Sequence, residues 1–167
     1  MPTARDRGTG MGYFNKEALG GGSVATPLAR QRVQAALDRQ NWVYRVDDDG
    51  DIYASWDEGY FWFFFYGENE EVLQVRGTWY GTLTQDHELQ ALRLANEINI
   101  DKLFPKVYTQ VTDDGQVLVR GELNIDYEKG VTDEQLTLHL RAAIGATIGA
   151  FGRFAEAFPD AAPVIEE

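Results

Sequence analysis

Apolar and polar residues alternate along the middle of the chain with a period of two, the pattern of half-buried β-strands. The alternation predicts strands at residues 42–46, 52–56, 60–66, 73–79, 107–111 and 117–125. Asp48-Asp49-Gly50 and Asp113-Asp114-Gly115 lie between pairs of these stretches and are typical of tight hairpin turns. Because the connections are short, neighbouring strands should pair antiparallel.

Three other stretches repeat apolar residues every three or four positions and are therefore predicted helices, at residues 26–40, 85–99 and 132–158. Thr26 is suited to cap the first helix, and Thr132 with Gln135 has the spacing of a capping box. The order is helix, four strands, helix, two strands, helix. It predicts an α+β domain, with the helices packed mainly on one face of an antiparallel sheet.

The third helix carries an unusual second stripe, made of Gly145, Gly149 and Gly152. Each interior glycine costs a helix about 1 kcal/mol relative to alanine. We expect the helix to approach the sheet or another helix closely along this stripe, since close approach would offset the cost.

The chain ends differ from this patterned body. Residues 1–25 are rich in Gly, Ser, Thr and Ala, which predicts a flexible N-terminal tail. Residues 26–160 should form a single domain, followed by an acidic C-terminal tail at 161–167.

Residues 60–66 are seven consecutive aromatic residues, and a strand cannot direct all of them into one core. The set Phe61, Phe63 and Phe65 has no polar atom in any side chain, so we assign it to the core. The alternate set is mostly Tyr and Trp, which need hydrogen-bond partners when buried, and we assign it to the second face. That set is Tyr60, Trp62, Phe64 and Tyr66.

Other strands add to this second face. Its expected aromatic members are Tyr53, Tyr80 and Tyr108, next to Leu118. Its expected polar rim is Gln74, Arg76, Arg120 and Glu122. An aromatic centre with arginine at its edge is typical of a protein-binding surface. Three explanations stay open: the N-terminal tail or second helix covers the face, the chain self-associates through it, or a different partner binds there.

The net charge of −12 is unevenly distributed. Residues 1–46 hold seven basic and three acidic residues, a net +4, which leaves −16 for the remainder. Such an acidic body disfavours nucleic-acid binding, because it repels phosphate. No apolar run approaches the ~20 residues of a membrane helix, and no secretory signal is evident. The chain has no cysteine, and a cytoplasmic location fits.

No motif in the sequence predicts catalysis, a metal site or a cofactor. His87 and His139 lack a second ligand at metal-binding spacing, and we expect surface or capping roles for them. The Asp-rich turns do not match a calcium-binding loop. Asn96 and Asn99 lie on the expected apolar face of the second helix, with Leu89 and Leu92. Their amides either bond the turn before Pro105 and end the helix, or recognise a partner's backbone.

The second half of the chain contains an ordered set of motifs, Asn96-Glu97-Ile98-Asn99, Phe104-Pro105-Lys106-Val107-Tyr108, Asp113-Asp114-Gly115 and Gly130-Val131-Thr132-Asp133-Glu134-Gln135-Leu136. This set resembles the YbjN-type family, a bacterial family described as sensory transduction regulators. The resemblance covers about residues 27–158, and it departs from the family at Ile98, where an aromatic residue is common. It implies a fold like the type III secretion chaperones, which are small acidic dimers, and brings no catalytic residues.

These observations favour a non-enzymatic regulatory module that binds a protein or peptide partner through the aromatic second face, acting as a homodimer. The alternative is a small-molecule sensor, with its ligand between the sheet and the N-terminal tail.

Overall fold

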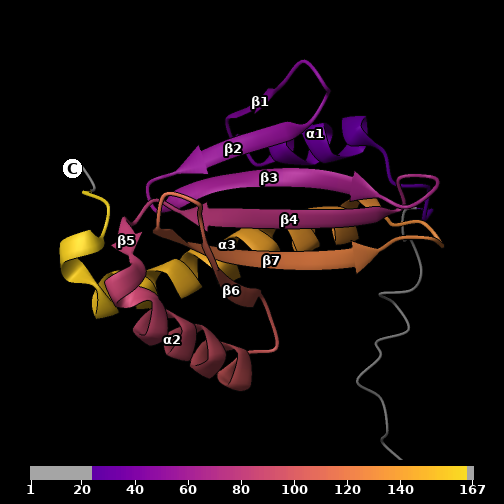
Figure 1. Cartoon of the computed structure of the whole chain (residues 1–167). Helices are drawn as coiled ribbons and strands as arrows, with labels where there is room; N and C mark the ends of the chain where they lie inside the picture. The colour runs from indigo at the N-terminus through magenta and orange to yellow at the C-terminus, as the bar shows by residue number, and fades with distance from the viewer. Residues whose placement is uncertain (1–23, 165–167) are drawn as a thin grey trace, which may run out of the picture.

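The computed structural model describes residues 24–164 and consists of one antiparallel sheet with three α-helices (Figure 1). The helices are α1 (Arg30–Arg39), α2 (Glu88–Asp101) and α3 (Asp133–Ala157), with short 3-10 turns η2 (Gln85–His87) and η3 (Pro159–Ala161). The strands are β1 (Tyr44–Val46), β2 (Ile52–Trp56), β3 (Gly59–Tyr66), β4 (Val72–Trp79), β5 (Leu83–Thr84), β6 (Lys106–Val111) and β7 (Gln116–Asp126).

The strands lie in the order β1-β2-β3-β4-β7-β6, and every described pair is antiparallel. The long strand β7 pairs with β4 along one edge and with β6 along the other, while the short β5 pairs with its first two residues. The predicted α+β class and element order are therefore confirmed. The pattern missed β5, because two residues are too few to show an alternation.

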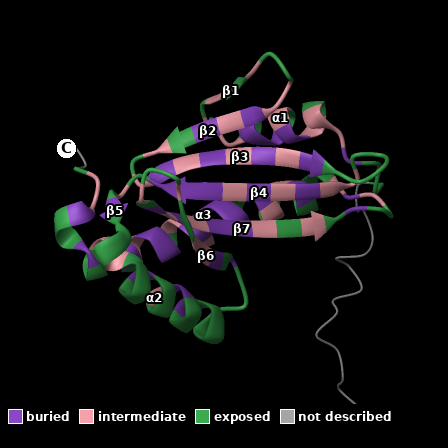
Figure 2. Ribbon diagram, in the orientation of Figure 1, coloured by how far each residue is buried: buried purple, intermediate pink, exposed green. Residues whose placement is uncertain are grey.

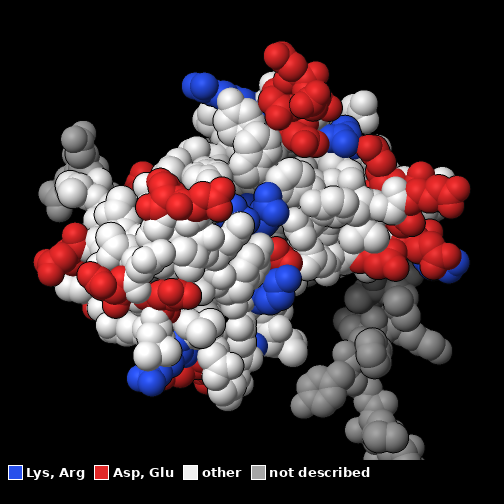
Figure 3. Space-filling view, viewed as in Figure 1, with Lys and Arg blue, Asp and Glu red and all other residues white. Residues whose placement is uncertain are grey.

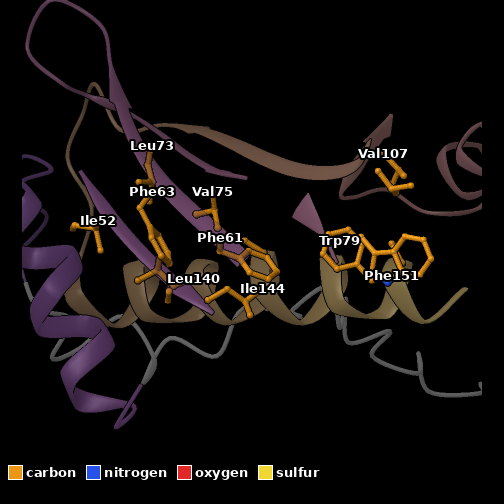
Figure 4. Packing of buried hydrophobic residues seen from close by; sticks show 14 of the residues in the cluster. Ile52, Phe61, Phe63, Leu73, Val75, Trp79, Val107, Leu140, Ile144 and Phe151 are labelled. Carbon is orange, nitrogen blue, oxygen red and sulfur yellow. The ribbon is translucent and has the colours of Figure 1, made fainter. Parts of the chain in front are cut away.

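Helices α1 and α3 cover one face of the sheet, which lies in front of them in Figure 1. Side chains of β2, β3 and β4 point from the sheet toward α3, as Figure 4 shows for Phe61 and Phe63. Both rings are fully buried, and Phe65 is 9% exposed. The ribbon of β3 alternates between buried and half-buried residues in Figure 2. The assignment of the three phenylalanines to the core is confirmed.

Close approach of α3 to the sheet depends on glycines, but these glycines are in the strands. Gly77 of β4 pairs with Gly121 of β7. A Cβ added at either position would lie under 3.0 Å from the Cγ2 methyl of Thr147 on α3. A Cβ added at Gly145, Gly149 or Gly152 would meet nothing within 4 Å. The expected role of the helical glycines is therefore wrong, since their stripe points away from the sheet.

Helix α1 begins later than predicted. Its N-cap residue is Ala29, and Thr26 instead forms an antiparallel bridge with Val131. The Arg32 guanidinium donates to the carbonyl oxygens of Thr26 and Pro27, both at 2.7 Å. Ala29 is itself extended, so the helix begins only at Arg30. The third helix has the predicted capping box of Thr132 and Gln135.

Helix α2 presents a different face to the protein than its leucines suggest. Its buried residues are Ala91, Ala95 and Ile98, whereas Leu89 and Leu92 are more than half exposed. The helix contacts β6 and α3, and small alanines suit close packing there. The predicted packing face of this helix is wrong.

Candidate functional site

The second face of the sheet, opposite α3, gathers seven aromatic side chains, which we call the aromatic face. They are Tyr53, Tyr60, Trp62, Phe64, Tyr66, Tyr80 and Tyr108. Most are half-buried, while Tyr66 and Tyr80 are 48% and 42% exposed. Helix α2 lies beside the sheet in Figure 1 and does not cover β3. The expected N-terminal tail lies almost entirely outside the described residues.

Strand register brings the predicted site residues into rows across the aromatic face. The central row runs through six paired strands and consists of Arg45, Tyr53, Trp62, Arg76, Glu122 and Lys106. The neighbouring row consists of Ser55, Tyr60, Thr78, Arg120 and Tyr108. Sequence reasoning omitted Arg45 and Lys106. Counting residues outward from the hairpin turn would have placed Arg45 opposite Tyr53.

The aromatic rings form a ladder along β3. Trp62 stacks on Phe64 with ring centroids 5.9 Å apart, and Phe64 lies 6.1 Å from Tyr66. Across the strands, Tyr53 lies 4.9 Å from Trp62. The Arg76 guanidinium lies over the Phe64 ring, 4.5 Å from its centroid. These neighbours hold the large rings in place, so a partner would meet an ordered surface.

Glu122 is not part of an exposed rim as predicted, because it is only 5% exposed. Its carboxylate is surrounded by donors from three sides. Oε2 accepts from the Tyr108 hydroxyl at 2.8 Å, and Oε1 accepts from Asn124 Nδ2 at 3.1 Å. Lys106 Nζ forms an ion pair with Oε1. A buried carboxylate is tolerated only with such partners.

These contacts shift two ionisations. Burial opposes the charged form of Glu122, but Lys106, Asn124 and Tyr108 outweigh it and hold the pKa of Glu122 below its ordinary value. Burial and the bond to Glu122 raise the pKa of Tyr108, against the opposing effect of Arg76 and Arg120. The Glu122 carboxylate is therefore charged, and the Tyr108 hydroxyl neutral, near neutral pH.

Asn96 and Asn99 do not belong to the aromatic face. Asn99 bonds the backbone of Val107 on β6 through both atoms of its amide. This favours the structural explanation of Asn99, although the bonded segment follows Pro105 rather than preceding it. Asn96 is exposed on α2.

The histidines have local partners. His87 Nδ1 accepts from the backbone N–H of Thr84 at 3.1 Å, in a capping box at η2. His139 Nδ1 lies 2.7 Å from the hydroxyl of the buried Tyr127. Within residues 24–164, no group of three or more His, Asp or Glu side chains is placed to hold a metal ion.

Among the grooves outside the aromatic face, two lie between helices. One, of about 470 Å³, has Arg39 on one side and Arg141 on the other, at the meeting of α1 and α3. The second, of about 360 Å³, lies between α2 and α3. Its lining is mostly apolar and consists of Ile98, Lys102, Phe104, Pro105, Ala146, Gly149, Ala150 and Arg153.

Among the described helices, none is both long enough and apolar enough to cross a bilayer. Comparison with curated protein sequences gives no match. Among solved structures, the chain is similar to the crystal structure of YbjN from E. coli, described as "a putative transcription regulator". The TM-score is 0.70 at 13% identity, over 81% of this chain and 96% of the E. coli chain. At this identity the likeness shows the fold.

Residues 29–156 match the sequence profile of the YbjN family, described as "Putative bacterial sensory transduction regulator". The match includes the whole sheet and nearly all of α3. The chain therefore belongs to the YbjN family.

Proposed function

We propose that this chain is a non-catalytic regulatory module of the cytoplasm that binds a protein or peptide partner through its aromatic face. The observation that carries the proposal is the sheet itself. One face packs on α3, while the other presents seven aromatic side chains that no described helix covers. Each such ring can bury ~150–250 Å². Two of these rings are exposed and five are half-buried, and an aromatic cluster of this kind at a surface is typical of an interaction site.

The family assignment supports a regulatory role, since the family is described as regulators of sensory transduction. The contacts within the face support binding rather than catalysis. The buried carboxylate of Glu122 is satisfied by three donors, and a group held in this way is poorly suited to exchange protons with a substrate.

The proposal is tested by quantitative affinity isolation from cells of the source organism. Wild type is compared with Trp62→Ala and with Leu138→Ala, which removes a 62% exposed side chain from α3. We expect that one or more proteins isolated with wild type are also isolated with Leu138→Ala but not with Trp62→Ala. Identical sets from all three baits would reject the aromatic face as the binding surface.

The same proposal includes homodimerisation, which sedimentation velocity of the purified chain tests. Self-association through the aromatic face would weaken in Trp62→Ala and persist in Leu138→Ala, whereas a dimer formed elsewhere would persist in both and leave the face to another partner. A monomer at every concentration would remove the dimer from the proposal and leave the binding of a different partner.

The second candidate is a small-molecule sensor. A ligand between the sheet and residues 1–25 depends on residues outside the described part of the chain. The groove between α2 and α3 gives this candidate separate support, because it is apolar and has Lys102 and Arg153 in its lining. Native mass spectrometry of the purified chain, followed by thermal-shift screening of metabolites, tests it. The absence of both a co-purified ligand and a thermal shift would count against the sensor.

A further inference from the structure

The middle of the aromatic face carries positive charge, although the chain as a whole has a net charge of −12. The central row holds three cations, Arg45, Arg76 and Lys106, against one carboxylate, Glu122. Arg120 adds a further cation in the next row. Lys106 and Glu122 neutralise one another as an ion pair, which leaves the arginines in excess.

Arg76 lies where it can receive an anion. Its guanidinium lies over Phe64 and, among the described residues, pairs with no carboxylate. An arginine stacked on a ring is held flat, and the N–H groups at its edge stay free for bidentate bonding to a carboxylate. Both Arg76 and Arg120 are half-buried, so an ion pair formed there is less screened than one on the open surface.

Two further atoms on this face lack partners. Arg120 NH1 donates to Gln110 Oε1 at 2.6 Å, but its Nε is buried without a hydrogen-bond partner in the described chain. Gln74 donates to Asn124 at 2.7 Å, while its Oε1 is likewise buried and unpaired. Buried polar atoms usually have partners, so these two indicate ordered water beneath the face.

The margin of the face has the opposite charge. Figure 3 looks onto this face and shows acidic side chains gathered around its edge, with basic ones nearer the middle. The acids come from the turns at the strand ends, and include Asp48, Asp49, Glu68, Glu70 and Glu128. A nucleic acid would bring its phosphates against this margin, which disfavours it. A peptide with a single central carboxylate avoids the repulsion.

We propose that the partner is a protein segment that places an Asp or Glu side chain on Arg76 and a neighbouring large apolar side chain on Trp62 and Phe64. This inference rests on the proposed function and names the chemistry of its partner. The carboxylate completes the pairing of Arg76. Basic residues on either side of the acidic one would meet the acidic margin.

The probe is a phage-displayed library of random dodecamer peptides, selected against the immobilised full chain. We expect the enriched peptides to carry Asp or Glu beside Trp, Phe or Leu. A selected peptide is then synthesised, and its Kd is measured for wild type, Trp62→Ala, Arg76→Gln and Arg93→Gln. Arg93→Gln removes the same charge from an exposed position on α2, outside the aromatic face.

Arg76→Gln should weaken binding about 10-fold or more, as expected for loss of a charge-assisted bidentate bond, while Arg93→Gln stays within about 2-fold. Replacing the peptide's Asp or Glu by Asn or Gln should weaken binding to wild type by the same factor as Arg76→Gln does. The same peptide change should weaken binding to Arg76→Gln only a little further. This peptide arm uses the unaltered protein, so it holds even where Arg76→Gln perturbs the fold.

One outcome would overturn this inference and leave the proposed function standing. In that outcome the selected peptides lose affinity for Trp62→Ala, contain no Asp or Glu, and bind Arg76→Gln as tightly as wild type. A library that yields no Trp62-dependent peptide would overturn both. A wild-type dimer that Arg76→Gln dissociates would assign the face to a second copy of the chain and overturn the inference.

Discussion

Asn99 holds Val107 by both of its backbone polar groups. Asn99 Nδ2 donates to the Val107 carbonyl oxygen at 2.8 Å, and the Val107 N–H donates to Asn99 Oδ1 at 2.9 Å. Among the described strands, β6 pairs only with β7, so it is an edge of the sheet. The asparagine occupies backbone groups that an edge strand otherwise offers to another chain.

Asn99→Ala should therefore lower the free energy of unfolding by about 1–3 kcal/mol, because it leaves a buried N–H and C=O unpaired. Asn96→Ala is the matched control, since Asn96 is exposed on the same helix. It should change stability by less than about 0.5 kcal/mol. Urea unfolding followed by circular dichroism measures both. Equal effects would mean that the paired bonds contribute nothing.

The two faces of β3 should respond differently to truncation. Phe63→Ala should cost about 3–5 kcal/mol, because the ring is fully buried between the sheet and α3. Trp62→Ala and Tyr66→Ala should cost less than half as much, since their rings are partly exposed already. Denaturant unfolding of the three variants tests this. Similar losses at all three positions would contradict the division into core and binding face.

Replacing glycine by alanine should lower stability in the sheet and raise it in helix α3. A Cβ at Gly77 would lie 2.7 Å from Phe61 Cε1 and 2.8 Å from Thr147 Cγ2, so Gly77→Ala should destabilise by about 1–3 kcal/mol. Gly145→Ala should stabilise by up to about 1 kcal/mol, because nothing lies within 4 Å of the added Cβ. Thermal unfolding measures both. Destabilisation by Gly145→Ala would show that this stripe packs on something.

Sequence patterns predicted correctly those parts of the fold in which the size and the polarity of a side chain both indicate the same face. Phe61 and Phe63 could be told from Trp62 because only the latter has a polar atom. The pattern failed on α2, where Leu89 and Leu92 looked like a packing stripe. Small residues allow a closer approach, so Ala91 and Ala95 form the packed face instead. Strand proximity to α3 likewise depends on pairing Gly77 with Gly121, which only register reveals.

The sequence predicted which residues lie on the aromatic face better than it predicted their burial and their hydrogen-bond partners. Alternation placed Arg76, Arg120 and Glu122 on the second face, but it does not report depth. Glu122 is buried because Lys106 and Tyr108 reach it from the neighbouring strand β6. Alternation alone does not give this register, which appears only when residues are counted outward from the turn at Asp113-Asp114-Gly115.

Protonation of Glu122 should contribute to the loss of stability at acid pH. Its pKa lies below the ordinary value in the folded protein, so the unfolded chain binds the proton more tightly. The stabilisation is present above the unfolded pKa of about 4.3 and is lost as the pH falls through the folded value. Glu122→Gln should lower stability at pH 7 and flatten the dependence between about pH 5 and pH 3.

Urea midpoints measured from pH 3 to pH 7 check this expectation, with Glu156→Gln on α3 as the exposed control. The control should reproduce the wild-type curve. A Glu122→Gln curve parallel to that of wild type would show that the carboxylate does not titrate as its contacts require.

Site-specific photo-crosslinking in living cells of the source organism tests the aromatic face as a binding surface most directly. A benzophenone amino acid is placed at Tyr66, exposed on the aromatic face, or at Leu138, exposed on α3. The account predicts that position 66 crosslinks to a partner protein and that position 138 does not. Crosslinks from position 138 alone, or from neither position, would contradict it.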